Sequence, residues 1–454
     1  MKERGAILLV ACYELGHQPL AVAWPAAFLE GRGYAPTVMD VSVEPFDAGK
    51  VAGARLVAIS VPMHTALRLG VGVAEQVRAL NPSCHVCFYG LYATLNADHL
   101  LATCADSVLG GEVEPQLVEL VAGLERGEPT RRPGPGLAKL AFPRPSRSAL
   151  PPLAKYAHLE RDGRLELTGY VEASRGCKHR CRHCPIPPVY GGRFFVVPRD
   201  VVLADVRQLV AAGARHITFG DPDFLNGPGH ALDVARALHA EFPDVTFDVT
   251  TKVEHLLRQR RRLPELAALG CAFVISAVES LSDTVLRHLD KGHTRADVVA
   301  ALDLARAAGL VLRPTWVAFT PWTTLDDYRE MLDFVGREDL VDHVDPVQYG
   351  IRLLVPPGSL LLKTPAMRPY LGGLVQEAFY YRWDHPDPRM DGLHAEVSAA
   401  VATAAERVED AAVTFARVVE LADAAAGAPS TRPASLAPVP DRRRPPRLTE
   451  PWFC

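Results

Sequence analysis

The fold of this chain is decided by the segment Glu172-Ala173-Ser174-Arg175-Gly176-Cys177-Lys178-His179-Arg180-Cys181-Arg182-His183-Cys184-Pro185. Its cysteines follow the spacing C-x3-C-x2-C. Iron–sulfur clusters are normally held by four thiolates, so a trio of closely spaced cysteines holds a four-iron cluster and leaves one iron open for chemistry. A catalytic zinc ion keeps one position free in the same way. We therefore predict a 4Fe-4S cluster on Cys177, Cys181 and Cys184.

A structural zinc site is the alternative interpretation of the same segment, with His179 or His183 as the fourth ligand. Structural zinc is commonly bound by two separated pairs of ligands. No second Cys/His pair with ligand-like spacing follows the trio within the usual distance. The spacing therefore favours the cluster.

The cysteine spacing resembles the signature of radical S-adenosylmethionine (AdoMet) enzymes. In that superfamily AdoMet binds the open iron through its amino and carboxylate groups and is cleaved reductively to a 5′-deoxyadenosyl radical. One position departs from the pattern, because many members carry an aromatic residue just before the third cysteine and this chain has His183. The resemblance implies a 4Fe-4S cluster and AdoMet as cofactors, and an electron donor such as flavodoxin or ferredoxin as a partner.

The cysteines lie at the start of a strand–helix alternation that we expect to span residues 168–365. Helical stretches separate the expected strands, and several end at a glycine, which suits the position just after a helix. Six such units fall short of a full eight-unit barrel, so we predict a partial (β/α)6 TIM-like barrel with its site at the carboxyl ends of the strands. The expected strands are Thr168–Ser174, His216–Gly220, Thr246–Lys252, Ala272–Val278, Val311–Ala318 and Val344–Leu354.

Upstream of the cysteines, residues 1–129 also alternate apolar strands with helices, which predicts a doubly wound parallel sheet and an α/β fold class. Such sheets bind ligands beyond the carboxyl ends of their strands. The expected strands are Ala6–Cys12, Thr37–Val43, Leu56–Val61, His85–Tyr89 and Ser107–Leu109. The expected helices include Leu20–Gly31, Thr65–Leu80 and Pro115–Gly123.

The remaining segments are predicted from composition. Residues 130–167 begin with a stretch rich in proline, glycine and arginine and are expected to link the two domains. Residues 366–427 are expected to form a helical extension. Residues 428–454 are rich in proline, serine and arginine and are expected to be a disordered tail that ends in Cys454.

Composition narrows the classes of partner and the compartment. The net charge of −4 creates no field that attracts nucleic acid or anionic membranes, so we expect neither as a partner. No stretch approaches the ~18 apolar residues of a membrane span, and the first apolar run is too short for a signal peptide. An odd total of nine cysteines without a secretory signal indicates reduced thiols and a cytoplasmic location.

Polar residues at the ends of two barrel strands are the candidates for AdoMet contacts. Gly220-Asp221 stands where the superfamily places a second motif, often Gly-Gly-Glu, that receives the amino group of AdoMet. The alternative is an Asp-Pro turn whose carboxylate caps a helix. Ser276 and Glu279 fall where members contact the ribose or the carboxylate, and a carboxylate can accept hydrogen bonds from both ribose hydroxyls. All four are therefore predicted cofactor-binding residues.

Two arginines are further candidates for the same pocket. Arg313 and Arg352 lie within apolar segments that we expect to be strands. An unpaired charge would be costly there. We therefore expect one or both to point into the barrel mouth, toward a carboxylate of AdoMet or of the substrate.

A doubly wound domain before a radical core resembles the cobalamin-binding domain of cobalamin-dependent radical AdoMet enzymes. The lower-ligand motif Asp-x-His-x-x-Gly is absent. His17 and His64 are available near strand ends but lack that spacing. The resemblance implies that cobalamin, if bound, has no protein histidine on its cobalt, and a domain that has lost the cofactor is the alternative.

Further stretches, among them Phe219–Phe224, Lys291–Asp297 and Arg352–Ser359, resemble a bacterial group, the CUAEP/CCAEP-tail radical AdoMet proteins. That group is named for a tail of Cys, then selenocysteine or Cys, then Ala-Glu-Pro. This sequence ends at Cys454, where a UGA selenocysteine codon read as a stop would end it. The resemblance makes Cys454 a candidate catalytic thiol in a redox pair; a natural terminus with one exposed cysteine is the alternative.

The family resemblance implies an enzyme that starts radical chemistry by cleaving AdoMet. With cobalamin bound, methylation of an unactivated carbon or a related group transfer is expected, on a small molecule or peptide that the sequence does not identify. A methylthiotransferase-like enzyme is an alternative, but it needs a second trio of cysteines in the amino-terminal domain. Cys12, Cys84, Cys87 and Cys104 do not show its spread. A non-catalytic cobalamin- or metal-binding module with a redox-active tail is a third interpretation.

Overall fold

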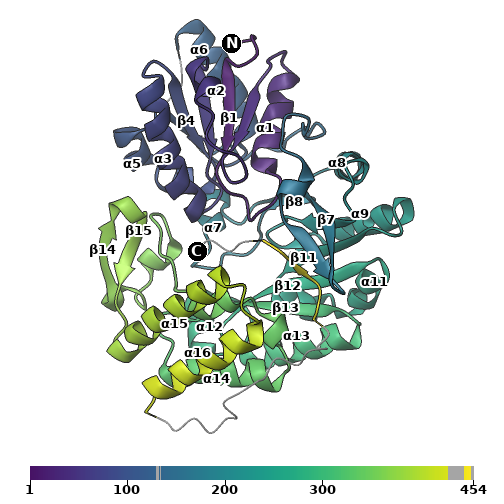
Figure 1. Cartoon of the computed structure of the whole chain (residues 1–454), viewed down its shortest axis with the longest axis vertical. Coiled ribbons are helices and arrows are strands. Elements are labelled where there is room, and N and C mark those ends of the chain that lie inside the picture. Colours follow the sequence, from purple (N-terminus) through teal and green to yellow (C-terminus); the bar gives the residue numbers. More distant parts are fainter. Residues whose placement is uncertain (129–131, 133, 428–443, 451–454) are drawn as a thin grey trace.

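The amino-terminal domain is a parallel five-stranded sheet in the order β2-β1-β3-β4-β5 (Figure 1). A computed structural model of the chain describes residues 1–128, 132, 134–427 and 444–450. The strands are β1 Ile7–Ala11, β2 Thr37–Asp40, β3 Leu56–Ser60, β4 His85–Tyr89 and β5 Ser107–Leu109. The helices are α1 Leu20–Glu30, α2 Ala48–Ala52, α3 His64–Leu80, α4 Leu91–Leu95, α5 Ala97–Thr103 and α6 Val113–Arg126.

Helices cover both faces of this sheet, as the predicted doubly wound architecture requires. Ile7 and Leu9 pack in one apolar cluster with α1 and α6, whereas Leu8 and Val10 pack in a second cluster with α3. Successive side chains of a strand point to opposite faces, so an uninterrupted apolar run serves both cores. The continuous run in β1 is the sequence signal of a buried parallel strand.

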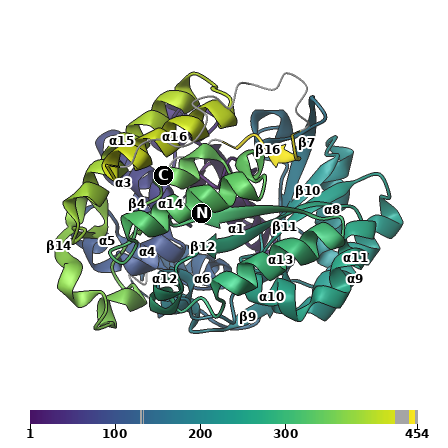
Figure 2. The ribbon, with the colours of Figure 1, turned by 90° about the horizontal axis from the view of Figure 1, so that it is seen from below.

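The second domain is built on a curled seven-stranded sheet in the order β13-β12-β11-β10-β7-β6-β16 (Figure 2). Strands β7, β10, β11, β12 and β13 are parallel to one another. They are β7 Arg164–Val171, β10 His216–Phe219, β11 Thr246–Thr251, β12 Cys271–Glu279 and β13 Val311–Trp316. The helices that follow them are α8 Arg199–Ala211, α9 Pro228–Glu241, α10 Val253–Arg258, α11 Leu263–Ala268, α12 Asp283–Leu289, α13 Arg295–Ala307 and α14 Leu325–Arg337.

The α/β fold class and the partial barrel are confirmed, but the expected sixth strand, Val344–Leu354, is not formed as a ladder. A single parallel bridge joins Phe319 to Arg352 at that place. The segment before it folds into the 3-10 helix η5, Pro346–Gly350. Proline has no N–H group for a ladder and its fixed φ suits the first position of a helix, so Pro346 diverts the chain.

Both outer edges of the predicted segments differ from expectation at one side of the sheet. Strand β6, His158–Arg161, pairs antiparallel with β7, so residues 158–167 of the expected linker belong to the sheet. Strand β16, Arg447–Leu448, pairs antiparallel with β6, so part of the expected disordered tail is ordered. An unpaired edge offers free N–H and C=O groups to any extended segment, and the tail satisfies them. Cys454 lies outside the described residues.

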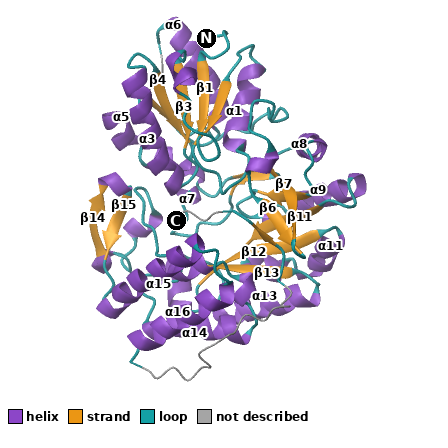
Figure 3. Ribbon diagram, in the orientation of Figure 1, coloured by secondary structure: helices purple, strands orange, loops and turns teal. Residues whose placement is uncertain are grey.

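The carboxyl-terminal extension contains a hairpin as well as the expected helices (Figure 3). The hairpin is β14 Leu371–Val375 with β15 Tyr380–Trp383, and it replaces the start of the helical region. Gly372 and Gly373 are poor helix formers, and the aromatic residues of β15 favour a strand. Helices α15 Pro388–Glu406 and α16 Ala411–Ala425 complete the extension. No described helix is long and apolar enough to span a membrane.

Candidate active site

The cysteine loop lies at the carboxyl end of β7, the first parallel strand of the barrel. Strand β8, Ser174–Gly176, leads into it and pairs with β9, Phe194–Val196, and helix α7, Ile186–Tyr190, follows it. Cys177 and Cys181 are buried and Cys184 is half-buried. Burial, and then the neighbouring Cys181 and Cys177, raise the pKa of the Cys184 thiol to about 12. The thiols therefore share one site, and metal binding would have to remove their protons.

The spread of the thiols fits a cluster rather than zinc. Tetrahedral ligands about 2.3 Å from a zinc ion are only ~3.8 Å apart. Among the described residues, the cysteine sulfurs do not form a set of three ligand atoms that all lie within 4.8 Å of one another. In a 4Fe-4S cluster each thiolate binds a different iron, which requires a wider spacing. His179 does not complete a zinc site either, because its ring faces His255 and Lys252.

Gly176 fixes the entry of the chain into the loop. Its φ is +71°, and a Cβ at this position would lie 2.4 Å from the carbonyl oxygen of Arg193. L-residues with a side chain avoid this φ, and the carbonyl belongs to rigid backbone. Only glycine therefore fits immediately before Cys177.

We expect Gly176→Ala to destabilise the chain by ~2 kcal/mol, from backbone strain plus the clash, and to reduce its iron content. Gly191→Ala is the matched control, because Gly191 has φ +62° and a Cβ added there would have no atom within 4 Å. Urea unfolding and iron analysis of the two variants measure the effect. Equal destabilisation in both variants would show that the contact with Arg193 is unimportant.

Asp221 lies beneath the loop rather than facing an open site. Its carboxylate accepts hydrogen bonds from the N–H of Ala173, at 2.9 Å, and from the hydroxyl of Ser174. Burial raises the pKa of Asp221 to about 7. Its side chain therefore ties the end of β10 to the chain that enters the cysteine loop, which corrects its expected role as a direct AdoMet contact. Gly220 does line a cavity, described below.

Glu279 ends β12 in the left-handed region, with φ +66°. Its Oε1 accepts from Nζ of Lys291 at 3.0 Å and contacts Nε2 of His183 at 3.2 Å. Although burial raises it, Lys291 and then His183 hold the pKa of Glu279 well below its usual range. Both contacts use Oε1, so the ionised carboxylate keeps Oε2 for a further donor such as a ribose hydroxyl.

Ser276 is placed on the wrong face of β12 for the expected AdoMet contact. Ile275 lines the interior of the barrel, and the next side chain along a strand points to the opposite face. Ser276 is fully buried there, beneath the helices. A period of two, counted from Glu279, misses this because the pairing of β12 with β13 shifts register between Ala277 and Glu279.

Neither predicted arginine is free to meet a ligand carboxylate. Arg313 points into the barrel, but it contacts Asp345 at 3.1 Å and the carbonyl of Pro446 at 3.4 Å. Arg352 donates to Asp391 at 2.7 Å and lies over the ring of Trp383, 3.7 Å from its centroid. The prediction that these charges are paired is right in kind, but their partners belong to the tail and the extension.

An inter-domain cavity of about 230 Å³ adjoins the cysteine loop. It lies between the carboxyl edge of the amino-terminal sheet and the mouth of the barrel. The amino-terminal domain contributes Glu14, Trp24, Ser60, Gly90 and Glu114, and the barrel contributes Tyr170, Glu172, Arg175, Gly176 and Gly220. Arg175 forms ion pairs with Glu112 at 3.2 Å, Glu114 at 2.6 Å and Glu172 at 2.9 Å. This buried network joins the two domains.

Residues 171–335 match the family model described as the radical SAM superfamily, SAM being AdoMet. The chain carries a radical SAM domain. The match begins at the end of β7 and includes the cysteine loop, so the family prediction made from the cysteine spacing is confirmed. Radical SAM domains use a 4Fe-4S cluster and AdoMet, and the geometry of the loop agrees with those cofactors.

Curated relatives of this radical SAM protein include methylthiotransferases. The ribosomal protein uS12 methylthiotransferase RimO of Desulfosudis oleivorans is 29% identical over 181 residues, covering 37% of this chain and 40% of that protein. The tRNA-2-methylthio-N(6)-dimethylallyladenosine synthase of Sorangium cellulosum is 28% identical, with coverage of 51% and 49%. The uncharacterized methyltransferase PH0819 of Pyrococcus horikoshii is 24% identical, with coverage of 63% and 64%. The chain thus spans 40% to 64% of the length of these relatives.

Two solved structures share the fold over both domains. One is the cobalamin-dependent AdoMet radical enzyme OxsB with aqua-cobalamin and AdoMet bound, with TM-score 0.67, 14% identity and coverage of 88% of this chain and 66% of that one. The other is the radical AdoMet methyltransferase TsrM of Kitasatospora setae with cobalamin and a [4Fe-4S] cluster bound, with TM-score 0.59, 17% identity and coverage of 74% and 73%. The amino-terminal domain of this radical SAM protein therefore has a cobalamin-binding-like fold.

One expected absence is contradicted by the relatives. We excluded nucleic acid as a partner because the net charge is −4. A relative named for the modification of tRNA overturns that exclusion. Net charge averages over the whole surface and says little about one local binding face.

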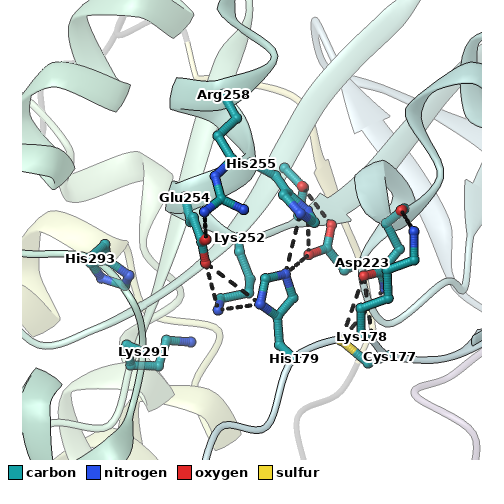
Figure 4. A network of polar contacts seen from close by, with 12 residues as sticks. Cys177, Lys178, His179, Asp223, Lys252, Glu254, His255, Arg258, Lys291 and His293 are labelled. Carbon is teal, nitrogen blue, oxygen red and sulfur yellow. Dashed lines mark hydrogen bonds and ion pairs between the residues drawn. The ribbon is translucent and has the colours of Figure 1, made fainter. Parts of the chain in front are cut away.

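Several residues of the radical SAM site were missed at the level of sequence. Lys291 and His183 contact Glu279, and Nδ2 of Asn226 lies 3.5 Å from the sulfur of Cys177. A second polar group, described below, surrounds His179 (Figure 4). The adjacency of His179 and His183 to the cysteines was the one available signal for their place in the site.

Glu14 gives this radical SAM protein a testable pH dependence. Burial first, and then Glu172 and Asp40, raise the pKa of Glu14 to about 8, even though the N–H groups of Leu20 and Ala21 lower it. A carboxyl that stays protonated in the folded chain and ionises in the unfolded chain makes stability fall as pH rises. That fall extends from the unfolded pKa, ~4.3, to about 8.

We expect the urea midpoint of the wild-type chain to fall between pH 5 and pH 8 by more than that of Glu14→Gln, whose side chain does not ionise. Unfolding curves of both proteins at the two pH values measure the difference. Glu119→Gln changes an exposed carboxyl on α6 and should behave as the wild type does. An identical pH response in Glu14→Gln and wild type would contradict the assignment.

Proposed function

We propose that this chain is a radical AdoMet enzyme that cleaves AdoMet reductively at a cluster on Cys177, Cys181 and Cys184 and uses cobalamin held between its two domains. One observation carries the proposal. The inter-domain cavity is lined by Gly176, the residue before the first cluster ligand, and by residues at the carboxyl edge of the amino-terminal sheet. Ligands of doubly wound sheets and of barrels bind at those edges, so two cofactors would meet there.

Residues of this chain would hold the cluster and AdoMet as follows. The three thiolates hold the cluster, which when bound supplies the electron that splits AdoMet into methionine and the 5′-deoxyadenosyl radical. Gly220 keeps the backbone at the end of β10 accessible, since a Cβ there would lie 2.3 Å from the ring of Tyr170. Glu279 offers Oε2 to a hydroxyl of AdoMet. Lys291, behind Glu279, keeps that carboxylate ionised and in place.

The donor set of the cavity fits the amide-rich rim of cobalamin. Oε2 of Glu114 is buried without a hydrogen-bond partner, and an amide N–H could satisfy it. Neither histidine near the edge offers a ligand to cobalt: His64 contacts the carbonyl of Ala378 at 2.7 Å, and His17 stacks on Tyr170 and contacts Glu450. Cobalamin when bound would supply a carrier for a methyl group, with no histidine of the described residues on its cobalt.

The reaction class that we propose is methylation of an unactivated carbon, or a related group transfer, on a small molecule or peptide. Methylthio transfer is the second candidate, because two of the relatives reported above are named for it. It requires a second trio of cysteines. Cys84 and Cys87 pack in separate apolar clusters on the two faces of the amino-terminal sheet, which does not favour one. A flavodoxin or ferredoxin as electron donor and a cytoplasmic location are part of the same proposal.

Anaerobic purification followed by iron, sulfide and cobalamin analysis and an assay for 5′-deoxyadenosine tests the proposal. Four irons, one cobalamin and AdoMet cleavage under a strong reductant are expected per chain. Ala21→Trp places a large side chain at the cavity wall and should abolish cobalamin binding while iron is retained. Ala102→Trp, at an exposed position of α5, is the matched control. Four irons without AdoMet cleavage would contradict the enzyme, and cleavage without cobalamin would contradict only its second part.

A further inference from the structure

A group of ligand-type side chains lies beside the cysteine loop but outside the cluster site (Figure 4). It consists of His179 in the loop, Asp223 after β10 and His255 on α10, which together could hold a metal ion. Nδ1 of His255 lies 2.8 Å from Oδ2 of Asp223, Nε2 of His179 lies 3.7 Å from the same oxygen, and the Nε2 atoms of the two histidines are 3.3 Å apart. Ligands about 2.1 Å from one metal ion are ~3.0 to 3.4 Å apart, so these separations suit a shared ion.

Hydrogen bonding does not account for this convergence. Asp223 is fully buried, and its Oδ2 has no hydrogen-bond partner although Nδ1 of His255 is close. Nδ1 of His255, a residue that is 8% exposed, has none either. Two buried polar atoms in contact without a hydrogen bond between them are costly unless a third species satisfies both. Lone pairs that converge on one point are the arrangement that a cation stabilises.

The atoms around the group orient its members as the outer partners of a metal site do. Oδ1 of Asp223 accepts from the hydroxyl of Thr251 at 2.8 Å and from the N–H of Leu225 at 3.2 Å, which leaves Oδ2 to ligate. Nδ1 of His179 lies 3.5 Å from Oε2 of Glu254. A histidine that donates one N–H to a carboxylate presents its other nitrogen to a metal.

Lys252 offers the competing state of the same group. Its Nζ lies 3.0 Å from Nδ1 of His179 and 3.3 Å from Glu254. If Lys252 donates to Nδ1, Nε2 of His179 carries the proton and points at His255, so no metal binds. The two states differ in one proton position on His179 and make opposite predictions for metal binding.

We propose that His179, Asp223 and a ring nitrogen of His255 bind a divalent first-row transition metal ion, separate from the iron–sulfur cluster, with its remaining positions open. Two imidazoles and one carboxylate suit zinc or ferrous iron. Because His179 lies between Cys177 and Cys181, the bound ion joins the cysteine loop to α10 and to the segment after β10. The ion therefore holds in place the loop that carries the cluster.

Zinc is the probe, because iron at this site would be counted with the cluster. The cluster-loaded protein is incubated anaerobically with two equivalents of Zn²⁺, freed of excess metal, and analysed for zinc and iron together with zinc X-ray absorption. One zinc per chain, with nitrogen and oxygen scatterers at about 2.0 to 2.1 Å, is the expected result. Sulfur scatterers at about 2.3 Å would place the zinc on the cysteines and overturn the proposal, as would the absence of bound zinc.

Two substitutions localise the ion. Asp223→Asn keeps an oxygen for Thr251 and Leu225 but replaces Oδ2 with an amide nitrogen that does not ligate. His255→Gln removes both imidazole nitrogens. Each should lower the zinc content at least fivefold while the iron content stays at four per chain, which also shows that the variant is folded. His99→Gln, in the amino-terminal domain, should keep one zinc. Unchanged zinc in both site variants would overturn the proposal without bearing on AdoMet cleavage.

Discussion

Replacing Cys181 with alanine is expected to remove the cluster and with it all detectable cleavage of AdoMet. Cys181 is the middle ligand of the trio and is buried, at 7% exposure. Two thiolates would remain for four irons, and no ligand-type side chain from outside the trio shares a close-packed metal-binding group with them among the described residues. Because the cluster supplies the electron, its loss removes the reaction itself and not one contribution to its rate. We expect a loss of at least 10³-fold, which corresponds to more than ~4 kcal/mol.

The measurements for Cys181→Ala are iron and sulfide content after anaerobic reconstitution and formation of 5′-deoxyadenosine. Cys104→Ala is the matched control, because Cys104 is half-buried beside α5 and lies in the other domain. It should keep four irons and wild-type cleavage. Four irons in Cys181→Ala would mean that another residue ligates the cluster, and cleavage without iron would disprove the assignment of the trio.

Local patterns in the sequence were sufficient for the cluster ligands and for most strands. The spacing of Cys177, Cys181 and Cys184 restricts their sulfurs to one loop whatever the rest of the chain does. Uninterrupted apolar runs such as β3 likewise predict buried parallel strands, because both faces of such a strand are covered. These signals lie within a few residues of one another, so they survive without knowledge of the tertiary structure.

The wrong predictions concern long charged side chains, whose partners are distant in the sequence. Arg313 was expected to meet a ligand, yet its partners include Asp345 and the carbonyl of Pro446, 133 positions away. A buried charge must be paired, but the sequence does not reveal with what. Lys291 was missed for the same reason: a lysine after a helix is normally solvated, and only the fold brings it to Glu279.

The two domains present their carboxyl edges to one another, and a carboxylate-rich network lies at their contact. Arg175 is one residue before Gly176 and pairs with two glutamates of the other domain, Glu112 and Glu114. The entry to the cysteine loop is therefore fixed by the amino-terminal domain as well as by the barrel. A change in the domain contact would reach the cluster ligands through two residues of backbone.

Removal of Lys291 is expected to be the most damaging single change that leaves the cysteines intact. Its side chain is 3% exposed, and Nζ lies 3.0 Å from Oε1 of Glu279. In Lys291→Met, which has a similar volume, Glu279 keeps only His183 as a charged neighbour. Breaking a buried ion pair by removing one partner costs about 3–5 kcal/mol. Lys291→Met/Glu279→Gln, which removes both charges, should recover most of that loss.

The pH dependence of this loss follows from the pKa of Glu279, which the folded wild-type chain holds well below its usual range. The stabilisation that ionised Glu279 gives is therefore complete above the unfolded pKa, ~4.3, and is lost only as pH falls through the lower folded value. Without Lys291, burial acts on the carboxyl with less opposition and favours its protonated form. The gap between wild type and Lys291→Met should therefore be largest near pH 7 and shrink toward pH 5. Urea unfolding of the cluster-free proteins at both pH values measures it. Lys155→Met, at a 45% exposed pair with Glu44, is the control and should change stability by less than ~1 kcal/mol. A gap that stays constant or widens toward pH 5 would show that Glu279 is not the charge that Lys291 neutralises.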